Sequence, residues 1–157
     1  MSTVRSKTFD LVMLVDDNDT YNFINRRILE KKKFAKNIEV QSSGIGALSY
    51  LEEHLENPNK LPDIIFLDIK MPLLNGHEFL FKLEQISRAA NNNKCKVVML
   101  SSSGDDDDIN QAKKYPSVIN FIQKPLTLEA LDSLNCNLES TTERPNSTMV
   151  NLSVPST

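Results

Sequence analysis

Five short, largely apolar runs lie along the chain, and each is bounded by polar or turn residues. They cover residues 11–15, 38–40, 63–67, 96–100 and 118–122. Short apolar runs of this kind are typical of strands that are buried on both faces of a parallel sheet. The run that ends at Leu67 lies between Pro62 and Pro72 and is followed directly by Asp68. We interpret it as the central strand.

Segments with helical spacing of apolar residues alternate with these runs. Asp17 or Asn18 can cap the first helix, Thr127 can cap the last, and a weaker fourth helix is predicted from Asp105 to about Tyr115. The predicted inward residues of the other helices are Tyr21, Ile24, Ile28 and Leu29; Ile45, Leu48, Leu51 and Leu55; Phe79, Leu80, Leu83, Ile86 and Ala90; and Leu128, Leu131, Leu134 and Leu138. Five strands alternating with five helices predict an α/β fold, a doubly wound parallel sheet with helices on both faces.

Composition narrows the class of protein. The chain has 157 residues, of which 39% are hydrophobic and 25% charged, as expected for one globular domain. A net charge of −3 argues against a nucleic-acid partner. No run is long enough to span a bilayer, and no secretory signal precedes Phe9. Cys95 and Cys136 lack CxxC spacing, so we expect reduced thiols and a cytoplasmic protein.

The ends of the chain differ in composition from its middle. Residues 1–8 are mostly polar, and Ser, Thr, Asn and Pro dominate residues 139–157. Such segments bury too little apolar surface to fold independently. We therefore expect a flexible N-terminus over 1–8, one domain over 9–138 and a disordered tail over 139–157.

Polar side chains follow four of the predicted strands. Asp16 and Asp17 follow the first, Asp68 the third, Ser101 the fourth and Lys124 the fifth. In a sheet of order 2-1-3-4-5, the first and third strands are neighbours at the switch point, where ligands bind. Each residue taken alone could merely end a strand, cap a helix or lie in solvent. Taken together, they predict one crevice at the carboxyl edge of the sheet.

The residue types at this edge favour phosphoryl chemistry. Two carboxylates about 4 Å apart repel each other by roughly 4 kcal/mol at an effective dielectric near 20, so a cation is needed. Mg²⁺ suits oxygen ligands because it binds one or two carboxylates together with waters and a phosphate. Asp68 could act as a nucleophile, and Lys124 and Ser101 could bind the oxygens of the phosphoryl group.

Four motifs in this order resemble a known family. They are Leu14-Val-Asp-Asp-Asn18, Phe66-Leu-Asp-Ile-Lys-Met-Pro72 with Asn75-Gly76, Val98-Met-Leu-Ser101, and Phe121-Ile-Gln-Lys-Pro125. From Phe9 to Leu138 the chain is similar to a response-regulator receiver domain of the chemotaxis-regulator type. The resemblance implies a flavodoxin-like fold with five parallel strands in the order 2-1-3-4-5.

The resemblance also implies roles for individual residues. Asp68 would be the phosphoacceptor, and Lys124 would bind the phosphoryl group and precede a cis peptide bond to Pro125. Ser101 and Phe121 would be switch residues, although Phe121 is equally well explained as a core side chain. The groups that would hold Mg²⁺ are Asp16, Asp17, Asp68 and the backbone carbonyl of Lys70.

A receiver domain implies protein partners. We expect a sensor histidine kinase or a histidine phosphotransfer protein as donor, and no catalysis beyond self-phosphorylation and slow dephosphorylation. No DNA-binding segment follows the predicted domain, so we expect output by protein contact or onward phosphotransfer. The face formed by the fourth helix, fifth strand and fifth helix would carry it, and a homodimer is compatible with the resemblance.

Three other functions fit the sequence less well. A phosphohydrolase of the haloacid-dehalogenase type usually needs a second Asp two residues after the nucleophile, where this chain has Lys70. A flavin carrier needs a hydroxyl-rich or glycine-rich phosphate loop after the first strand, where Asp16 and Asp17 would repel the phosphate. A receiver that acts without phosphorylation is disfavoured because every active-site position is filled.

Overall fold

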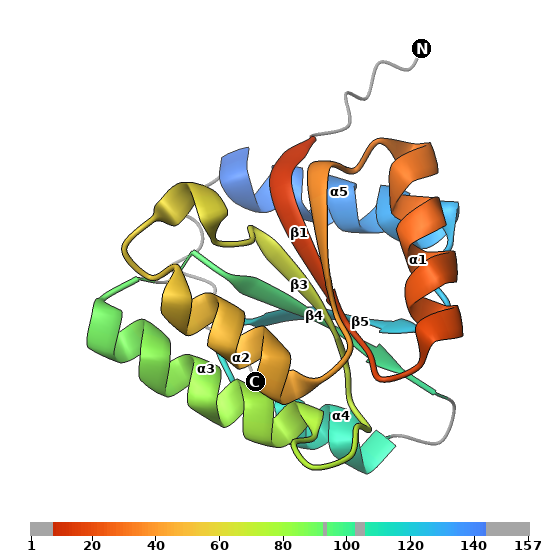
Figure 1. Ribbon diagram of the computed structural model, residues 1–157. Helices are drawn as coiled ribbons and strands as arrows, with labels where there is room; N and C mark the ends of the chain where they lie inside the picture. The colour runs from red at the N-terminus through yellow and green to blue at the C-terminus, as the bar shows by residue number, and fades with distance from the viewer. Residues whose placement is uncertain (1–7, 93, 103–105, 144–157) are drawn as a thin grey trace.

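Five strands form one parallel sheet in a computed structural model that describes residues 8–92, 94–102 and 106–143. Their order is β2-β1-β3-β4-β5, which confirms the predicted topology (Figure 1). The strands are β1 (Phe9–Val15), β2 (Ala35–Gln41), β3 (Ile64–Asp68), β4 (Lys96–Ser101) and β5 (Val118–Gln123).

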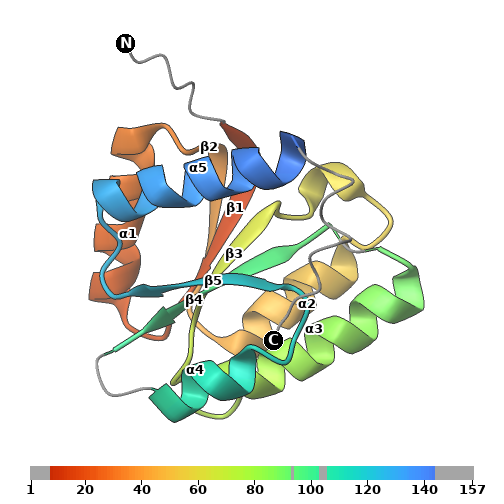
Figure 2. The same ribbon diagram turned by 180° about the vertical axis from the view of Figure 1, so that it is seen from behind.

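Helices cover both faces of the sheet. Helices α1 and α5 lie on one face, and α2, α3 and α4 lie on the other, as the two opposite views show (Figures 1 and 2). They are α1 (Asp19–Lys32), α2 (Gly44–Glu53), α3 (Gly76–Ala90), α4 (Asp106–Ala112) and α5 (Leu128–Glu143), with a 3-10 turn η1 at Pro58–Lys60. Among the described helices, none is both long and apolar enough to cross a membrane.

The three central strands are buried on both faces because successive side chains point to opposite sides of a strand. One set packs against α2, α3 and α4, and the alternate set packs against α1 and α5. The first set contains Met13, Val15, Ile65, Leu67, Val97 and Met99, and the second contains Val12, Leu14, Ile64, Phe66, Val98 and Leu100. Burial on both faces explains why these strands are apolar at almost every position.

Several element ends differ from the prediction. β2 spans Ala35–Gln41 rather than 38–40, because an edge strand is partly solvated and its polar residues hide its length. β1 begins at Phe9, α4 ends at Ala112, and α5 continues to Glu143, beyond the predicted end at 138. Asp105 lies outside the described residues, as do residues 1–7 of the N-terminus predicted over 1–8 and residues 144–157 of the tail predicted over 139–157.

The inward faces of three helices differ from the apolar prediction as well. In α1 the buried residues are Asn22, Asn25 and Leu29, while the rest of the predicted apolar stripe is only half-buried beside them. Ile45 at the start of α2 and Ala90 at the end of α3 are exposed. A helix that carries buried asparagines on its core face must use them for hydrogen bonds.

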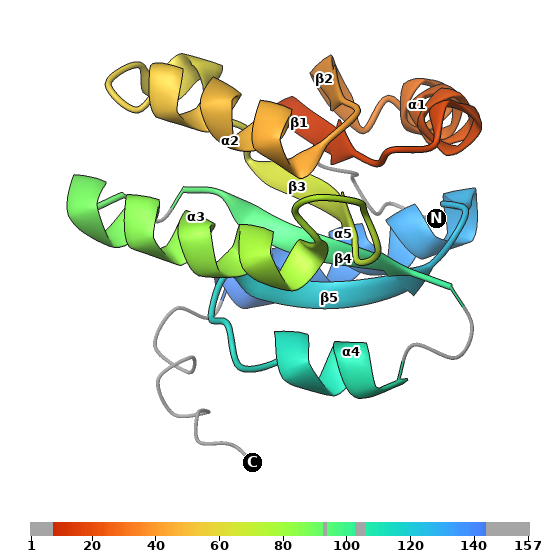
Figure 3. The ribbon, with the colours of Figure 1, turned by 60° about the horizontal axis from the view of Figure 1, so that its bottom comes forward.

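Side-chain caps fix where three helices begin, directly after loops at the carboxyl edge of the sheet (Figure 3). Asn18 caps α1, as predicted, by accepting the Tyr21 N–H at 3.0 Å. Asn75 and Glu78 form a reciprocal capping box at α3. Thr127 accepts the Ala130 N–H at 3.1 Å and caps α5. The caps therefore stabilise the loops that follow β1, β3 and β5.

Gly76 allows α3 to start directly against the end of β3. Its N–H donates to the Ile69 carbonyl at 2.8 Å. A Cβ atom at this position would lie 2.9 Å from the Ile69 Cα and 3.0 Å from the Asp68 carbonyl oxygen. Both of these neighbours are backbone atoms, so they cannot rotate away as a side chain could.

We predict that Gly76→Ala lowers the free energy of unfolding by about 1–3 kcal/mol, the usual cost of overpacking. Urea denaturation followed by circular dichroism measures it. Gly46→Ala is the matched control, because its Cβ would meet the end of the Gln41 side chain, which can move. We expect that variant to change stability by less than about 1 kcal/mol, since alanine also favours helix. Equal losses in the two variants would contradict this account.

Candidate functional site

Three carboxylates meet at the carboxyl edge of the sheet. Asp68 is the last residue of β3, and Asp16 follows the neighbouring strand β1, with Val15 paired to Leu67. Only 4% of Asp68 and 1% of Asp16 are exposed, whereas Asp17 is an exposed residue. One oxygen from each of the three carboxylates lies within 4.8 Å of the others. The predicted cluster is therefore present in the structure.

Hydrogen bonds from the start of α1 hold Asp16 in place. Its Oδ1 accepts the Asn18 N–H at 2.9 Å, and its carbonyl accepts the side-chain amide of Asn22 at 2.8 Å. Its own N–H donates to the Gln41 carbonyl of β2 at 3.2 Å. With Oδ1 and the backbone engaged, Oδ2 faces the rest of the cluster.

Lys124 reaches this cluster from the loop after β5. Its Nζ lies 3.2 Å from Asp68 Oδ1 and 3.3 Å from Asp16 Oδ2, and its side chain is only 8% exposed. The Lys124–Pro125 peptide bond is cis, as predicted. The Lys124 N–H donates to the Ser101 carbonyl at 2.8 Å, which ties the loop to the end of β4.

Two side chains of α1, Tyr21 and Asn25, support Lys124. The sequence predicted Tyr21 as an inward-facing helix residue, but it assigned neither side chain a role at this site. Asn25 accepts the N–H of Leu126 at 2.9 Å through its buried side-chain oxygen, and so holds the loop just after Pro125. The ring of Tyr21 has its centroid 4.3 Å from Lys124 Nζ, a cation–π contact. The sequence gives only a weak sign of the role of Asn25, because it shows no more than a polar side chain at helical spacing on an otherwise apolar stripe.

Burial and a neighbouring negative charge change the protonation of Asp68. Burial, and next the negative charge of Asp16, raise the pKa of Asp68 from 3.8 to about 6. The Lys124 ammonium and a backbone hydrogen bond from Lys70 oppose this rise. Burial lowers the pKa of Lys124, but the charges of Asp68 and Asp16 outweigh it, and the pKa is raised overall. Lys124 is therefore a fixed cation at neutral pH.

The charges in this cluster fit a divalent cation. Three carboxylates face one ammonium, so ionisation of all of them leaves two negative charges uncompensated. Hard carboxylate oxygens are ligands that Mg²⁺ prefers. Asp16, Asp17 and Asp68 would hold the ion. The role predicted for the Lys70 carbonyl stays a prediction.

The two predicted switch residues occupy different places. Ser101 is the buried last residue of β4, one position beyond Leu100, which pairs with Asp68. Phe121 lies in β5 beside Met99, and it is half-buried against the core on the α2–α3–α4 face. Ser101 thus lies at the carboxyl edge, while Phe121 lies deeper along the sheet. Their roles as switch residues stay predictions.

The loop between β3 and α3 contains an unusual turn. The Leu74 N–H donates to the Pro72 carbonyl at 2.7 Å, across Leu73, whose φ is 68°. A γ-turn with positive φ is rare and strained, above all at a residue other than glycine. The turn leaves the Leu73 side chain exposed, two residues after Met71. The sequence predicted a loop here but not this conformation.

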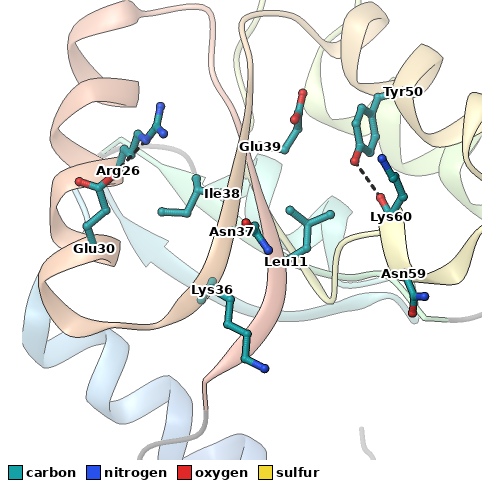
Figure 4. A pocket seen from close by; sticks show the side chains of 11 residues that line it. Leu11, Arg26, Glu30, Lys36, Asn37, Ile38, Glu39, Tyr50, Asn59 and Lys60 are labelled. Carbon is teal, nitrogen blue, oxygen red and sulfur yellow. Dashed lines mark hydrogen bonds and ion pairs between the residues drawn. The ribbon is translucent and has the colours of Figure 1, made fainter.

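A separate hollow of about 580 Å³ lies along the edge strand β2 and draws side chains from both sides of it (Figure 4). Within it, Arg26 pairs with Glu30 at 3.2 Å, and the Tyr50 hydroxyl donates to the Lys60 carbonyl at 2.9 Å. The lining includes none of the clustered carboxylates. The acidic cluster is therefore the better candidate for chemistry.

The fold and the site define a doubly wound α/β protein with an acidic pocket and a buried lysine at the carboxyl edge of its sheet. The family model described as the response regulator receiver domain matches residues 12–134. The chain therefore belongs to this family, whose members act in two-component signalling. The family predicted from the four motifs is confirmed.

Individual relatives agree with the family model. The chain is 34% identical over 122 residues to a probable methanogenesis regulatory protein, FilR2, of Methanothrix harundinacea, covering 77% of this chain and 76% of that one. It is 32% identical over 136 residues to the two-component response regulator ARR17 of Arabidopsis thaliana, covering 81% and 83%. A solved two-component response regulator from Cytophaga hutchinsonii is 34% identical with a TM-score of 0.75, covering 85% and 99%.

We predict that Asp68→Asn stabilises the metal-free protein at neutral pH. Because folding raises the pKa of Asp68 to about 6, the stability this group contributes is complete below pH 4 and lost as pH rises through 6. About two pKa units correspond to at most about 3 kcal/mol. With EDTA present, we expect the asparagine variant to gain about 1–3 kcal/mol at pH 7.5 and much less at pH 4.5.

Urea denaturation at the two pH values measures this difference. Asp10→Asn is the matched control, because Asp10 is an exposed aspartate that forms a surface ion pair with Lys36 at 3.3 Å. We expect little change from that substitution at either pH. A gain from Asp68→Asn that is equal at pH 4.5 and 7.5 would show that ionisation of Asp68 is not its cause.

Proposed function

We propose that this protein is a single-domain response regulator that accepts a phosphoryl group on Asp68 from a phosphohistidine in a Mg²⁺-dependent reaction. The observation that carries the proposal is the contact between the buried Asp68 carboxylate and Lys124 Nζ at 3.2 Å, beside two further carboxylates. This arrangement supplies a nucleophile, a fixed cation and a set of metal ligands within one pocket.

The proposed reaction is an in-line transfer between two residues. An Asp68 oxygen attacks phosphorus, the new P–O bond forms, and the electron pair of the P–N bond returns to the donor imidazole. Because the pKa of Asp68 is about 6, its nucleophilic carboxylate form dominates at neutral pH. On phosphorylation, the Lys124 ammonium would leave its contact with an Asp68 oxygen and bind a phosphoryl oxygen instead. Bound Mg²⁺ would neutralise the negative charge that develops on the phosphoryl group.

The proposed output is a population shift between two arrangements of the pocket. The Ser101 hydroxyl would bind a phosphoryl oxygen, and Phe121 would move further inward. The outer face of α4, β5 and α5 would change with them. In support, the described part of α4 is only seven residues long, and a hydrogen bond between His77 Nε2 and Asp108 Oδ1 at 3.2 Å joins it to the first turn of α3. A short helix attached to the loop beside Asp68 suits an element that moves with that loop.

We further propose a sensor histidine kinase or a histidine phosphotransfer protein as the donor, and a protein rather than a nucleic acid as the output partner. FilR2 and ARR17 match over 76% and 83% of their own lengths, so the matched region makes up most of those two proteins. Cys95 and Cys136 are free thiols, which suits the reducing cytoplasm. Beyond its own phosphorylation and slow dephosphorylation, we propose no enzymatic activity.

We predict that Asp68→Asn abolishes labelling by acetyl phosphate with Mg²⁺, because an amide cannot attack phosphorus. Intact-mass spectrometry detects the added phosphoryl group, and Asp10→Asn is the control because Asp10 lies near the opposite end of β1. We expect the control to label as the wild type does. Undiminished uptake in the Asp68 variant would place the phosphoacceptor elsewhere.

We also predict that Asp17→Asn weakens Mg²⁺ binding at least about tenfold, as measured by isothermal titration calorimetry. A unit charge about 4 Å from a divalent ion contributes about 2 kcal/mol even at the dielectric of water. Asp19→Asn is the control, since Asp19 is an exposed aspartate two residues away and outside the cluster. If both substitutions weaken binding equally, general charge rather than coordination explains the affinity.

A further inference from the structure

The ammonium of Lys124 has a third neighbour besides its two carboxylates. A protonated lysine offers three N–H donors. Asp68 and Asp16 take two directions at 3.2 and 3.3 Å, and the Tyr21 ring centroid lies 4.3 Å from the same nitrogen. The lysine side chain is 8% exposed. The aromatic ring therefore occupies a side of the ammonium that water would otherwise take.

The backbone of Tyr21 is anchored where this contact is made. Its N–H donates to the capping side chain of Asn18 at 3.0 Å, in the first turn of α1. Asn18 itself donates its N–H to Asp16 at 2.9 Å. The backbone of Tyr21 is thus attached to the same loop that carries Asp16 and Asp17, through two hydrogen bonds that link it to Asp16.

We propose that Tyr21 is a positioning residue for the phosphoryl-binding ammonium. This inference rests on the proposed function and names a residue that the four motifs do not assign. Lysine has a flexible four-carbon stem, so holding its ammonium in one place removes rotamer freedom that a contact must offset. The face of the Tyr21 ring holds the ammonium in the pocket, whether its other partners are carboxylates or phosphoryl oxygens.

The contact has the strength needed for this role. A cation–π contact is weak at exposed sites and severalfold stronger when the cation is removed from water. The same helix contains an exposed cation–π pair for comparison. Arg27 lies 5.8 Å from the ring centroid of Phe23, which is 62% exposed. That pair is remote from the carboxylates and belongs to the weak class. The Tyr21–Lys124 contact, with its lysine buried, belongs to the strong class.

The test replaces Tyr21 with leucine, with phenylalanine and with a series of increasingly fluorinated phenylalanines. Fluorine weakens the negative face of the ring while keeping its shape nearly constant. For each full-length variant, the affinity for beryllium trifluoride with Mg²⁺ and the acetyl phosphate concentration giving half-maximal labelling rate are measured. Mg²⁺ affinity alone is measured in parallel.

We expect Tyr21→Leu to weaken beryllium trifluoride binding and to raise the half-maximal acetyl phosphate concentration by about tenfold. Tyr21→Phe should retain both values within about twofold, and each added fluorine should weaken them progressively. Mg²⁺ affinity should stay constant across the series, because the ring contacts the ammonium and not the carboxylates. Phe23→Leu, the matched control on α1, should leave all three measurements unchanged.

Three outcomes would overturn the inference. A flat fluorine series in protein that still labels would reduce Tyr21 to a packing residue and leave the proposed function standing. Equal losses from Tyr21→Leu and Phe23→Leu would assign the effect to α1 as a whole. A wild-type chain that neither labels nor binds beryllium trifluoride would remove the proposed function, and this role with it. If Tyr21→Leu does not fold, the fluorinated series still decides between these outcomes.

Discussion

Electrostatic repulsion at the carboxyl edge is the constraint on which the rest of this structure depends. Pairing of β1 with β3 brings Asp16 and Asp68 together, and both carboxylates are almost completely removed from water. Buried like charges are unfavourable unless they are neutralised or held by hydrogen bonds. One ammonium, from Lys124, opposes them. The site therefore carries an excess of negative charge that makes it receptive to a divalent cation.

The surrounding scaffold keeps this unfavourable arrangement in place. Asn22 and Asn25 use buried amides of α1 to hold the loops after β1 and β5. Gly76 lets α3 start directly against the end of β3, where a larger residue would meet backbone atoms. These residues contact loop backbone and not the carboxylate groups themselves. Their common effect is to fix loop positions, so that distant parts of the chain present their charges to one point.

The sequence predicted the fold and the charged residues well because both follow from simple patterns. Strands buried on two faces are apolar throughout, and a polar residue directly after such a strand must lie at the sheet edge, as Asp68 and Asp16 do. The roles of Tyr21 and Asn25 were not predictable in this way. An asparagine on a helix gives no sign of which distant N–H it will accept, because that depends on tertiary packing. Nor does a leucine at position 73 indicate a positive φ.

The hydrogen bond between His77 and Asp108 couples the movement of α3 to that of α4. His77 is the second residue of α3, directly after Gly76, and α3 therefore begins at the end of the loop that follows Asp68. Any rotation of that first turn must either carry Asp108 along or break the bond. A local displacement beside Asp68 can thus reach α4, which lies on the same face of the sheet as α3, through these two side chains.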